Sequence, residues 1–374
     1  MIIMKKILVV FVEITEYNLA RIQNVYETID EVEFSYVYCS SSISGHETSR
    51  SLPKNAIVLT GSPKQKKKQL INFAKKEKFD FIIINGYSDI DRLGLIMYCR
   101  KKGIPYAIET DTPLNIPSSP LKKIIKRLLL RKIFSGNSYG FAGGTRQKEL
   151  FRYYGMPESN IKLMPMSVDV DFFREIFERL PDKEFLKIEH EIEDKKIALY
   201  VGRFAPEKNL FTLLAAVRKL KEKRNDFRLH LIGKGEQKIE ILNYCNQYNL
   251  QDNVYVYDYM KAQELVAFYK MADVFVLPSS YEPWGLVVNE SLACNLPVVA
   301  SRNVGCVDDL IKEDENGDLF DSVDVEGLTL LLEKWLYKKE GIKGVSVIDS
   351  WNHEIYRKLF TECLTEVFTV ATRE

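Results

Sequence analysis

Two glutamates, Glu282 and Glu290, lie eight residues apart around the expected start of a helix. The apolar run 274–278 is typical of a buried strand, and the run 286–293 is typical of a helix packed on that strand. Backbone N–H groups near Gly285 would then point outward without helical partners, which favours a phosphate. Eight helical residues span roughly 12 Å, about the distance between the sugar and the ribose of a nucleotide sugar. The alternative is one glutamate at a favourable helix N-terminus and a second on its solvated flank.

A second strand, expected at 197–201, leads into the loop 202–209. Gly202 permits close approach of a backbone, and Arg203 and Lys208 are able to reach one diphosphate from this single loop. The alternative is that both cations form surface ion pairs. Together with a helix N-terminus, the two cations would stabilise the charge on a departing nucleoside diphosphate.

A third strand, expected at 228–232, leads into a Gly-Lys-Gly-Glu turn that begins at Gly233. A dinucleotide-binding fingerprint requires a third glycine at position 238, where this chain has Lys238. The loop therefore predicts a tight turn, either beside a ligand or structural only, and not a nicotinamide site.

The composition is typical of a globular protein of two domains, with 374 residues and 46% hydrophobic content. No apolar run reaches the 18 or so residues of a membrane span, and no secretory signal is recognisable, so we expect a cytoplasmic protein. Its six dispersed cysteines are typical of reduced thiols. Residues 1–169 carry a net charge of +10 and the remainder −9. This asymmetry favours an anionic partner of the first half, or attraction between the two halves.

Short apolar strands alternate with amphipathic helices, which is typical of mostly parallel sheets covered on both faces. Two such series predict two Rossmann-like domains at 1–170 and 171–351, with a helix at about 352–374 packed back on the first. An irregular acidic stretch is expected from the join to Lys195. Strands are expected at 6–12, 33–38, 56–59, 79–84, 106–108, 138–142, 161–165, 197–201, 228–232, 253–257, 274–277 and 297–300, and helices at 66–78, 93–102, 145–154, 210–224, 237–248 and 264–271.

Five motifs occur in a fixed order: VGRFAPEKN at 201–209, HLIGKG at 230–235, PSSYEPWGLVVNESLA at 278–293, LPVVAS at 296–301 and NGDLF at 316–320. Together they resemble family 4 retaining glycosyltransferases of the α/β GT-B fold, over about residues 161–322. The resemblance implies two Rossmann-like lobes whose parallel sheets face a central cleft. It also implies retaining transfer of a sugar from a nucleotide diphosphate donor to a glycan, lipid-linked or other hydroxyl acceptor, in bacterial cell-surface polysaccharide or glycoconjugate synthesis.

The resemblance also implies a role for each matching residue. The expected catalytic groups are Arg203 and Lys208 on the diphosphate and Glu282 on the donor sugar. Asp111 of the first lobe is a further catalytic candidate, which the resemblance itself does not imply. The expected donor-binding groups are Gly202 and Gly233 in their loops, Tyr259 and Met260 near the base, the backbone N–H groups of Gly285 and Leu286, and Glu290 on the ribose. Trp284, beside the diphosphate loop, is expected to pack on the sugar. For Trp284 the alternative is a structural contact at the helix start. Asp258 stands where the family usually has glycine. No cofactor or metal is expected, and the leaving phosphate oxygen would deprotonate the acceptor.

The first lobe departs from the family pattern. Residues 13–18 replace a usual glycine-rich loop, and the strand end at 107–113 lacks a usual histidine. Glu109 or Asp111 is expected in its place, and the alternative is that both cap a loop. The pair Asp169 and Asp171 has the D-x-D form of metal-dependent transferases, but it lies at the join, far in sequence from the diphosphate loops, which speaks against a metal site.

The segment 121–134 predicts a basic amphipathic helix. Its six cations would face an anionic membrane, peripherally on the inner face, while leucines and isoleucines insert. The alternative is an ordinary helix whose apolar stripe is buried.

No nucleic-acid partner is expected. Two other functions remain open, namely a sugar-nucleotide epimerase or glycoside phosphorylase of the same fold, and a non-catalytic nucleotide-sugar or carbohydrate-binding protein.

Overall fold

The computed structural model describes residues 4–40, 50–112, 114, 120–192, 194–338 and 345–371. The chain divides into two compact units, one formed by 1–168 with 352–374 and the other by 169–351. The sequence predicted a division at 170/171 and the return of a C-terminal helix to the first domain. The structural division lies two residues before the predicted one.

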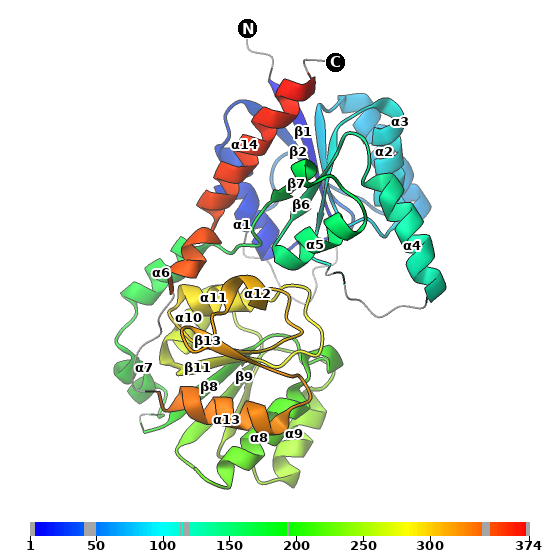
Figure 1. Ribbon diagram of the computed structural model, residues 1–374. Helices are drawn as coiled ribbons and strands as arrows, with labels where there is room; N and C mark the ends of the chain where they lie inside the picture. The colour runs from blue at the N-terminus through cyan, green and yellow to red at the C-terminus, as the bar shows by residue number, and fades with distance from the viewer. Residues whose placement is uncertain are drawn as a thin grey trace. The chain divides into compact units, whose positions relative to one another are not determined.

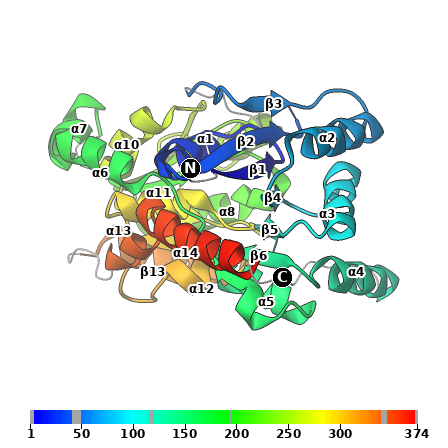
Figure 2. The same ribbon diagram turned by 90° about the horizontal axis from the view of Figure 1, so that it is seen from above.

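The first unit is built on a parallel sheet of seven described strands in the order β3-β2-β1-β4-β5-β6-β7 (Figures 1 and 2). The strands are β1 Lys5–Phe11, β2 Val32–Tyr38, β3 Ala56–Val58, β4 Phe81–Asn85, β5 Tyr106–Thr110, β6 Ser138–Ala142 and β7 Ile161–Leu163. The helices are α1 Glu16–Asn24, α2 Pro63–Glu77, α3 Ile90–Lys102, α4 Pro120–Ile133, α5 Thr145–Tyr153 and α14 His353–Ala371, with short 3₁₀ turns at Tyr26–Thr28 and Glu158–Asn160.

Two hydrophobic cores lie on opposite faces of this sheet, because successive side chains of a strand point to opposite sides. In β1, Leu8 and Val10 join a core under α2 to α5, whereas Ile7 and Val9 join a core under α1 and α14. Figure 2 shows α14 (red) on the face opposite α2 and α3. The buried residues of α14 recur at helical spacing, so the C-terminal helix is part of the first unit's core.

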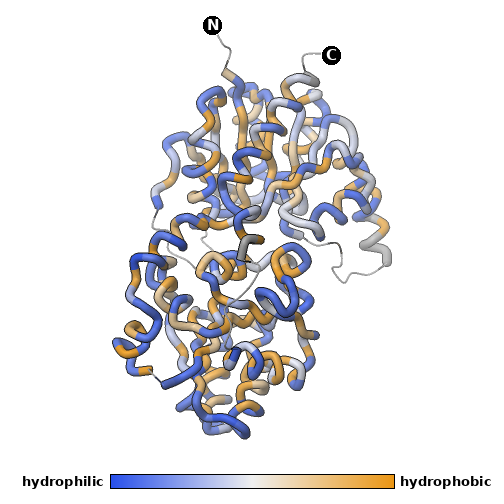
Figure 3. Tube along the Cα trace, turned by 60° about the vertical axis from the view of Figure 1, so that its left-hand side comes forward, coloured by the Kyte–Doolittle hydropathy of each residue, from blue (hydrophilic) through white to orange (hydrophobic). Residues whose placement is uncertain are grey.

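The second unit has a parallel sheet of six described strands in the order β10-β9-β8-β11-β12-β13. Hydrophobic residues are concentrated along the interior strands of each unit (Figure 3). The strands are β8 Lys196–Val201, β9 Phe227–Ile232, β10 Val254–Tyr257, β11 Val274–Leu277, β12 Val298–Ser301 and β13 Gly317–Phe320. The helices are α6 Val170–Arg179, α7 Lys183–Glu189, α8 Leu210–Lys221, α9 Lys238–Gln247, α10 Ala262–Met271, α11 Leu286–Ala293, α12 Val307–Leu310 and α13 Val325–Leu336, with 3₁₀ turns at Pro206–Lys208 and Val345–Ser350.

The prediction of an irregular stretch up to Lys195 is wrong, because α6 and α7 occupy most of it. Asp169 caps α6 by accepting a hydrogen bond from the Phe172 N–H at 3.3 Å. Val170 and Phe173 then fall on one face of the helix and are buried. The high acid content of this segment therefore marks the solvated face of a helix and not an absence of structure.

Candidate functional site: a charged crevice in the second unit

The carboxyl ends of β8 and β11 lie side by side at the point where the strand order of the second sheet reverses. From β8 the sheet continues through β9 and β10, and from β11 it continues through β12 and β13. Loops diverge at such a point and leave a crevice, which is where open α/β sheets bind their ligands. The predicted residues on the loops after β8 and β11 therefore share one edge of this unit.

Lys208 and Glu282 come from these two loops and meet in an ion pair, in which the Lys208 ammonium contacts Oε2 of Glu282. Their side chains are only 14% and 13% exposed. Ser279 donates a hydrogen bond to the same carboxylate oxygen at 3.3 Å. The structure thus brings together one predicted cation and the first predicted carboxylate.

Arg203 lies on the loop after β8, as Lys208 does, but 54% of its side chain is exposed. Its guanidinium pairs with Glu207 at 2.5 Å. An exposed ion pair of this kind contributes only about 0–1 kcal/mol. Arg203 is therefore able to leave Glu207 and turn toward an anionic ligand at small cost.

Two glycines hold the loops after β8 and β9 against each other. Gly202 and Gly233 have φ angles of 155° and 150°, at the edge of the region that favours glycine. A Cβ atom at Gly233 would lie 1.9 Å from the carbonyl oxygen of Gly202. The N–H of Phe204 also donates to the carbonyl of Lys234 at 2.9 Å. Gly233 is thus required for close packing of one loop on the other, whereas a Cβ atom at Gly202 would lie 2.8 Å from the hydroxyl oxygen of Tyr200.

Tyr200, at the buried end of β8, fixes the backbone of the cation-bearing loop. Its hydroxyl donates to the carbonyl oxygen of Arg203 at 2.8 Å. Burial raises the pKa of Tyr200 well above its ordinary value, and the nearby Glu282 carboxylate raises it further. The phenol therefore stays protonated and remains a hydrogen-bond donor.

Gly285 is the N-cap residue directly before α11 and has a left-handed φ of 98°. The preceding loop is held by the backbone of 302–306, in which the N–H of Gly305 donates to the carbonyl of Glu282 at 2.9 Å. A Cβ atom at Gly305 would lie 1.8 Å from the carbonyl oxygen of Pro283. Leu286, the first residue of α11, thus presents its backbone N–H at a rigidly placed helix start.

Asn209 is a site-positioning residue whose role the sequence did not reveal. Its side-chain amide donates to the carbonyl oxygens of Pro278, at 3.1 Å, and Ser322, at 2.7 Å. It thereby ties the loop after β8 to the ends of β11 and β13. Its residue type could have indicated its conformation, since Asn209 has a left-handed φ of 55° between a 3₁₀ turn and a helix. Asparagine adopts this conformation more readily than most residues.

Glu290 lies inside α11 and is only 3% exposed. The Tyr269 hydroxyl of α10 donates to its Oε2 at 2.7 Å. The second predicted carboxylate is therefore a buried group held in place by a neighbouring helix, and not a solvated flank residue.

The prediction that Trp284 packs on a sugar is not supported by its position. The side chain is 2% exposed, its indole N–H donates to Asn289 at 3.0 Å, and its ring packs on Trp351 at 5.1 Å between centroids. Trp284 therefore has the alternative role, a structural contact at the start of α11.

Tyr259 and Met260 follow the carboxyl end of β10 and are half-buried. The Lys234 ammonium lies 5.5 Å from the Tyr259 ring centroid. Asp258, which replaces the usual glycine, forms an ion pair with Lys238 at 2.5 Å. This end of the sheet thus offers an aromatic face between charged groups, beside the loop of Gly233.

Residues 182–343 match the family described as glycosyl transferases group 1. Residues 182–343 therefore resemble a group 1 glycosyl transferase domain. The domain coincides with most of the second unit and includes every predicted donor-side residue.

Curated relatives match part of the chain. An uncharacterized glycosyltransferase of Methanocaldococcus jannaschii is 30% identical over 176 residues, which cover 46% of this chain and 43% of that protein. A D-inositol 3-phosphate glycosyltransferase of Segniliparus rotundus is 29% identical over 178 residues, which cover 46% of this chain and 38% of that protein. The chain thus spans less than half the length of these two relatives.

Solved structures match the whole fold. Sucrose-phosphate synthase from Thermosynechococcus elongatus superposes with a TM-score of 0.74 at 18% identity, covering 98% of this chain and all of that one. The Anabaena protein HepE, in complex with UDP and glucose, also gives a TM-score of 0.74, at 15% identity, covering 97% of this chain and all of that one. The fold is therefore GT-B, with the group 1 domain as its second Rossmann-like unit.

Outside the group 1 domain, Asp111 and Glu109 have different environments at the end of β5. Glu109 is buried and forms an ion pair with Arg21 of α1, while its Oε2 accepts a hydrogen bond from Asn85 at 2.8 Å. Asp111 is exposed, and its backbone carbonyl accepts from Gln147 at 2.8 Å. Of the two candidates for the missing histidine, only Asp111 presents its side chain to solvent.

The D-x-D pair serves the start of α6, which lies just before the group 1 domain. Asp169 is the N-cap, and Asp171 lies in the first turn, where the helix dipole favours an acid. Within the described ranges, no group of three or more histidine, cysteine or acidic side chains is arranged to hold a metal ion.

The basic segment predicted at 121–134 forms α4, at Pro120–Ile133. Its Leu130 and Ile133 are buried in the first unit, whereas Ile124 and Leu128 are 58% and 69% exposed. The side chains of 120–123 and 125, which include Lys122 and Lys123 of the predicted basic face, lie outside those that the structure describes. No helix in the described part of the chain is long and apolar enough to cross a membrane.

Proposed function

We propose that this protein is a glycosyltransferase that moves a sugar from a nucleotide diphosphate donor to a hydroxyl acceptor, with retention of anomeric configuration. The observation that carries the proposal is the contact of Lys208 with Glu282 beside the start of α11. A diphosphate in this crevice would meet an ammonium and a helix N-terminus, and a carboxylate for the sugar hydroxyls lies next to them.

The charges of the crevice suit departure of a nucleoside diphosphate. Lys208 and Arg203 would neutralise the negative charge that grows on the leaving phosphate, and the N–H groups of Gly285 and Leu286 would donate hydrogen bonds to its oxygens. The leaving phosphate oxygen would take the proton of the acceptor hydroxyl, so no metal ion and no separate base is required in this proposal. The bond from the sugar to the phosphate oxygen breaks as the bond from the sugar to the acceptor oxygen forms, and the free nucleoside diphosphate is released.

A donor panel tests the proposal. HepE was solved with UDP, and one relative from Mycolicibacterium smegmatis is named as GDP-mannose-dependent, so UDP-sugars and GDP-sugars belong in the panel with ADP-sugars. We expect one donor to be consumed only when an acceptor is present, with EDTA making no difference. An isomerised donor would indicate an epimerase, phosphate-dependent cleavage a phosphorylase, and binding without turnover a non-catalytic module.

Matched variants locate the donor. Lys208→Gln should weaken binding of the preferred nucleoside diphosphate by about tenfold or more, because a charge-assisted hydrogen bond is lost. Lys219→Gln is the control, since Lys219 pairs with Glu326 on the exposed side of α8. Equal affinity in Lys208→Gln and the control would exclude this crevice as the diphosphate site.

For the first unit we propose that Asp111 contributes to the reaction. It follows the carboxyl end of β5 and is exposed, as a group that meets substrate must be. Asp111→Asn should lower the turnover number without changing the midpoint of thermal unfolding. Turnover near that of the wild type would remove Asp111 from the site.

We further propose that α4 binds an anionic membrane surface and that the acceptor is lipid-linked, as in the synthesis of a bacterial cell-surface polysaccharide. Ile124 and Leu128 lie one turn apart and are exposed together, beside the cations of the helix. Sedimentation with anionic vesicles at low salt should recover the protein, and Leu128→Glu should abolish this recovery. Failure to bind such vesicles would end the membrane proposal and leave the transferase proposal standing.

A further inference from the structure

A cavity of about 390 Å³ lies in the second unit at the edge of the sheet opposite the Lys208–Glu282 pair. Asp273 and Pro297 form part of its wall, and each directly precedes a strand, β11 or β12. The donor crevice lies instead at the carboxyl ends of these strands. The cavity is therefore separate from the proposed donor site, although α11 borders on both.

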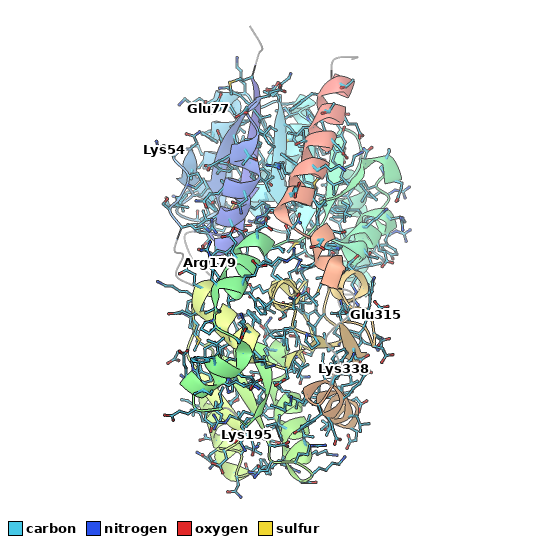
Figure 4. The ribbon with its side chains drawn as sticks, turned by 90° about the vertical axis from the view of Figure 1, so that its left-hand side faces the viewer. Lys54, Glu77, Arg179, Lys195, Glu315 and Lys338 are labelled. Atoms are coloured by element: carbon cyan, nitrogen blue, oxygen red, sulfur yellow. The ribbon has the colours of Figure 1, made fainter. Side chains whose placement is uncertain are left out.

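Lysines dominate the charged lining of this cavity. The described lining contains Lys183, Lys270 and Lys338 against two acids, Asp182 and Asp273. Lys338 follows the end of α13 (Figure 4). The wall is thus rich in ammonium groups that converge from α7, α10 and the end of α13.

Asp273 is shared among three lysines. Lys183 lies 2.8 Å, Lys196 3.5 Å and Lys187 4.0 Å from its carboxylate oxygens. One carboxylate neutralises only one of these ammonium groups, so positive charge remains around Asp273, which is 11% exposed, while Lys183 and Lys196 are 31% and 41% exposed. Burial lowers the pKa of Lys183, the attraction of Asp273 opposes this effect, and the neighbouring Lys187 and Lys196 add to it.

The hydrogen bonds of Lys270 and Lys338 go to neutral acceptors, although the Asp314 carboxylate also attracts Lys338. Lys270 donates to the carbonyl oxygens of Phe177 and Leu180 at 2.7 and 2.8 Å, and Lys338 donates to that of Asp314 at 3.0 Å. A carbonyl orients an ammonium group but carries no negative charge to balance it. An ammonium has three donors, so each of these lysines retains capacity for a further acceptor beyond those contacts.

We propose that the cavity is a second ligand site, for a small oxyanion of the phosphate type, formed by Lys183, Lys270 and Lys338. Such an anion would neutralise the excess charge around Asp273 and accept hydrogen bonds from ammonium groups that are already oriented. The size of the cavity suits a small phosphorylated molecule more than a macromolecule.

Two connections link this site to Glu290. Tyr269 lines the cavity and donates its hydroxyl to the Glu290 carboxylate at 2.7 Å. In addition, α11 is flanked by its N-cap Gly285 in the donor crevice and by its C-cap Cys294 in the cavity wall. An anion that shifts Tyr269 or the end of α11 therefore alters the position of Glu290, and so changes donor affinity. This coupling rests on the proposed function, whereas the binding site itself does not.

Titration calorimetry with inorganic phosphate, at constant ionic strength set with chloride, tests the site. We expect saturable binding that Lys338→Gln weakens by about tenfold, because a charged donor is lost. Lys183→Gln should weaken it similarly, with circular dichroism confirming that both variants are folded. Arg203→Gln, on the donor crevice, should leave phosphate affinity unchanged. Equal affinity in both lysine variants, or loss of binding in Arg203→Gln, would overturn the proposal.

The coupling is tested by measuring the affinity for the nucleoside diphosphate with and without saturating phosphate. We expect a change of about fivefold, within the usual range for coupled sites. Tyr269→Phe, which removes only the hydroxyl, should abolish the change while phosphate still binds. An unchanged nucleotide affinity in the wild type would refute the coupling. Absence of any nucleotide binding would instead count against the proposed function, and the phosphate titration would still stand.

Discussion

The Lys208 ammonium contacts the Glu282 carboxylate although the two residues lie 74 positions apart in the sequence. Both groups are therefore engaged before a donor arrives. A diphosphate must compete with Glu282 for Lys208, and the carboxylate repels the phosphate that takes its place. The pair keeps Lys208 oriented, while the sugar hydroxyls of the donor would offer Glu282 new partners.

Glu282→Gln should therefore have opposite effects on binding and on transfer. Affinity for the nucleoside diphosphate without sugar should rise by about fivefold, or about 1 kcal/mol, because Lys208 is released from its partner. Transfer should fall, because a neutral amide holds the sugar hydroxyls less strongly than a carboxylate. Calorimetry and initial rates measure the two effects.

Glu207→Gln is the matched control for that substitution. It removes a carboxylate of the same loop that pairs with the exposed Arg203. A smaller gain in nucleotide affinity is expected, because the Arg203–Glu207 pair is screened by solvent. Weaker nucleotide binding by Glu282→Gln would show that Lys208 is positioned by Glu282 and not withheld by it.

The proposed role of Glu290 predicts a contact with a hydroxyl of the donor ribose. Glu290→Gln should weaken binding of the ribonucleoside diphosphate by about tenfold, since a charged acceptor of the ribose hydroxyls is lost. The melting temperature should change little, because a glutamine oxygen still accepts the hydrogen bond of Tyr269.

The 2′-deoxy nucleotide provides the control. If Glu290 binds the ribose, the deoxy nucleotide should bind the wild type more weakly and should be affected less by Glu290→Gln than the ribonucleotide. The same loss for both nucleotides would contradict a contact with the 2′-hydroxyl.

The loops of the donor crevice could be located from the sequence because each follows an apolar strand and contains a glycine. Gly202 directly follows β8, Gly233 directly follows β9, and Gly285 directly precedes α11. Each of the three has a positive φ. The hydrophobic periodicity and the positions of the glycines were therefore enough to predict that Lys208 and Glu282 lie at one edge of a sheet.

What the sequence did not reveal depends on contacts between distant segments. The backbone of 302–306 supports the Glu282 loop, and the role of Gly305 there is visible only through its approach to Pro283. Trp284 was expected at the ligand because it lies beside ligand residues, but Trp351, whose ring packs against it, is remote in sequence. Local patterns do not encode such partners.

The buried pair of Arg21 and Glu109 is a further example, since 88 positions separate them. Arg21 also lies over the Tyr356 ring of α14, at 5.2 Å from its centroid. Removing one partner leaves an uncompensated buried charge, so Arg21→Met or Glu109→Gln should each cost about 3–5 kcal/mol in the first unit. The double variant should cost less than the sum of the two single variants. Denaturant unfolding measures all three, and additive costs would show that the two charges do not interact.

The burial of His230 predicts how the free energy of unfolding depends on pH. The side chain is 1% exposed on β9, and burial lowers its pKa to about 3, with Arg228 and His190 adding to the effect. Its two ring nitrogens have no hydrogen-bond partner among the described residues, and Tyr257 and Phe268 surround the ring at 5.3 and 5.9 Å between centroids. The folded state therefore holds a neutral imidazole.

In the unfolded chain His230 regains a pKa near 6.5, so the unfolded state binds a proton that the folded state rejects. The stability that this neutral histidine permits is fully present above pH 6.5 and is lost as the pH falls from 6.5 toward 3. At pH 5 the loss should be about 2 kcal/mol. His230→Leu, which cannot be protonated, should remove this component from the difference between pH 7 and pH 5 in the free energy of unfolding. His190→Gln, at an exposed position, should retain most of it. A wild type and a His230→Leu variant with the same dependence on pH would show that His230 is hydrated or protonated in the folded state.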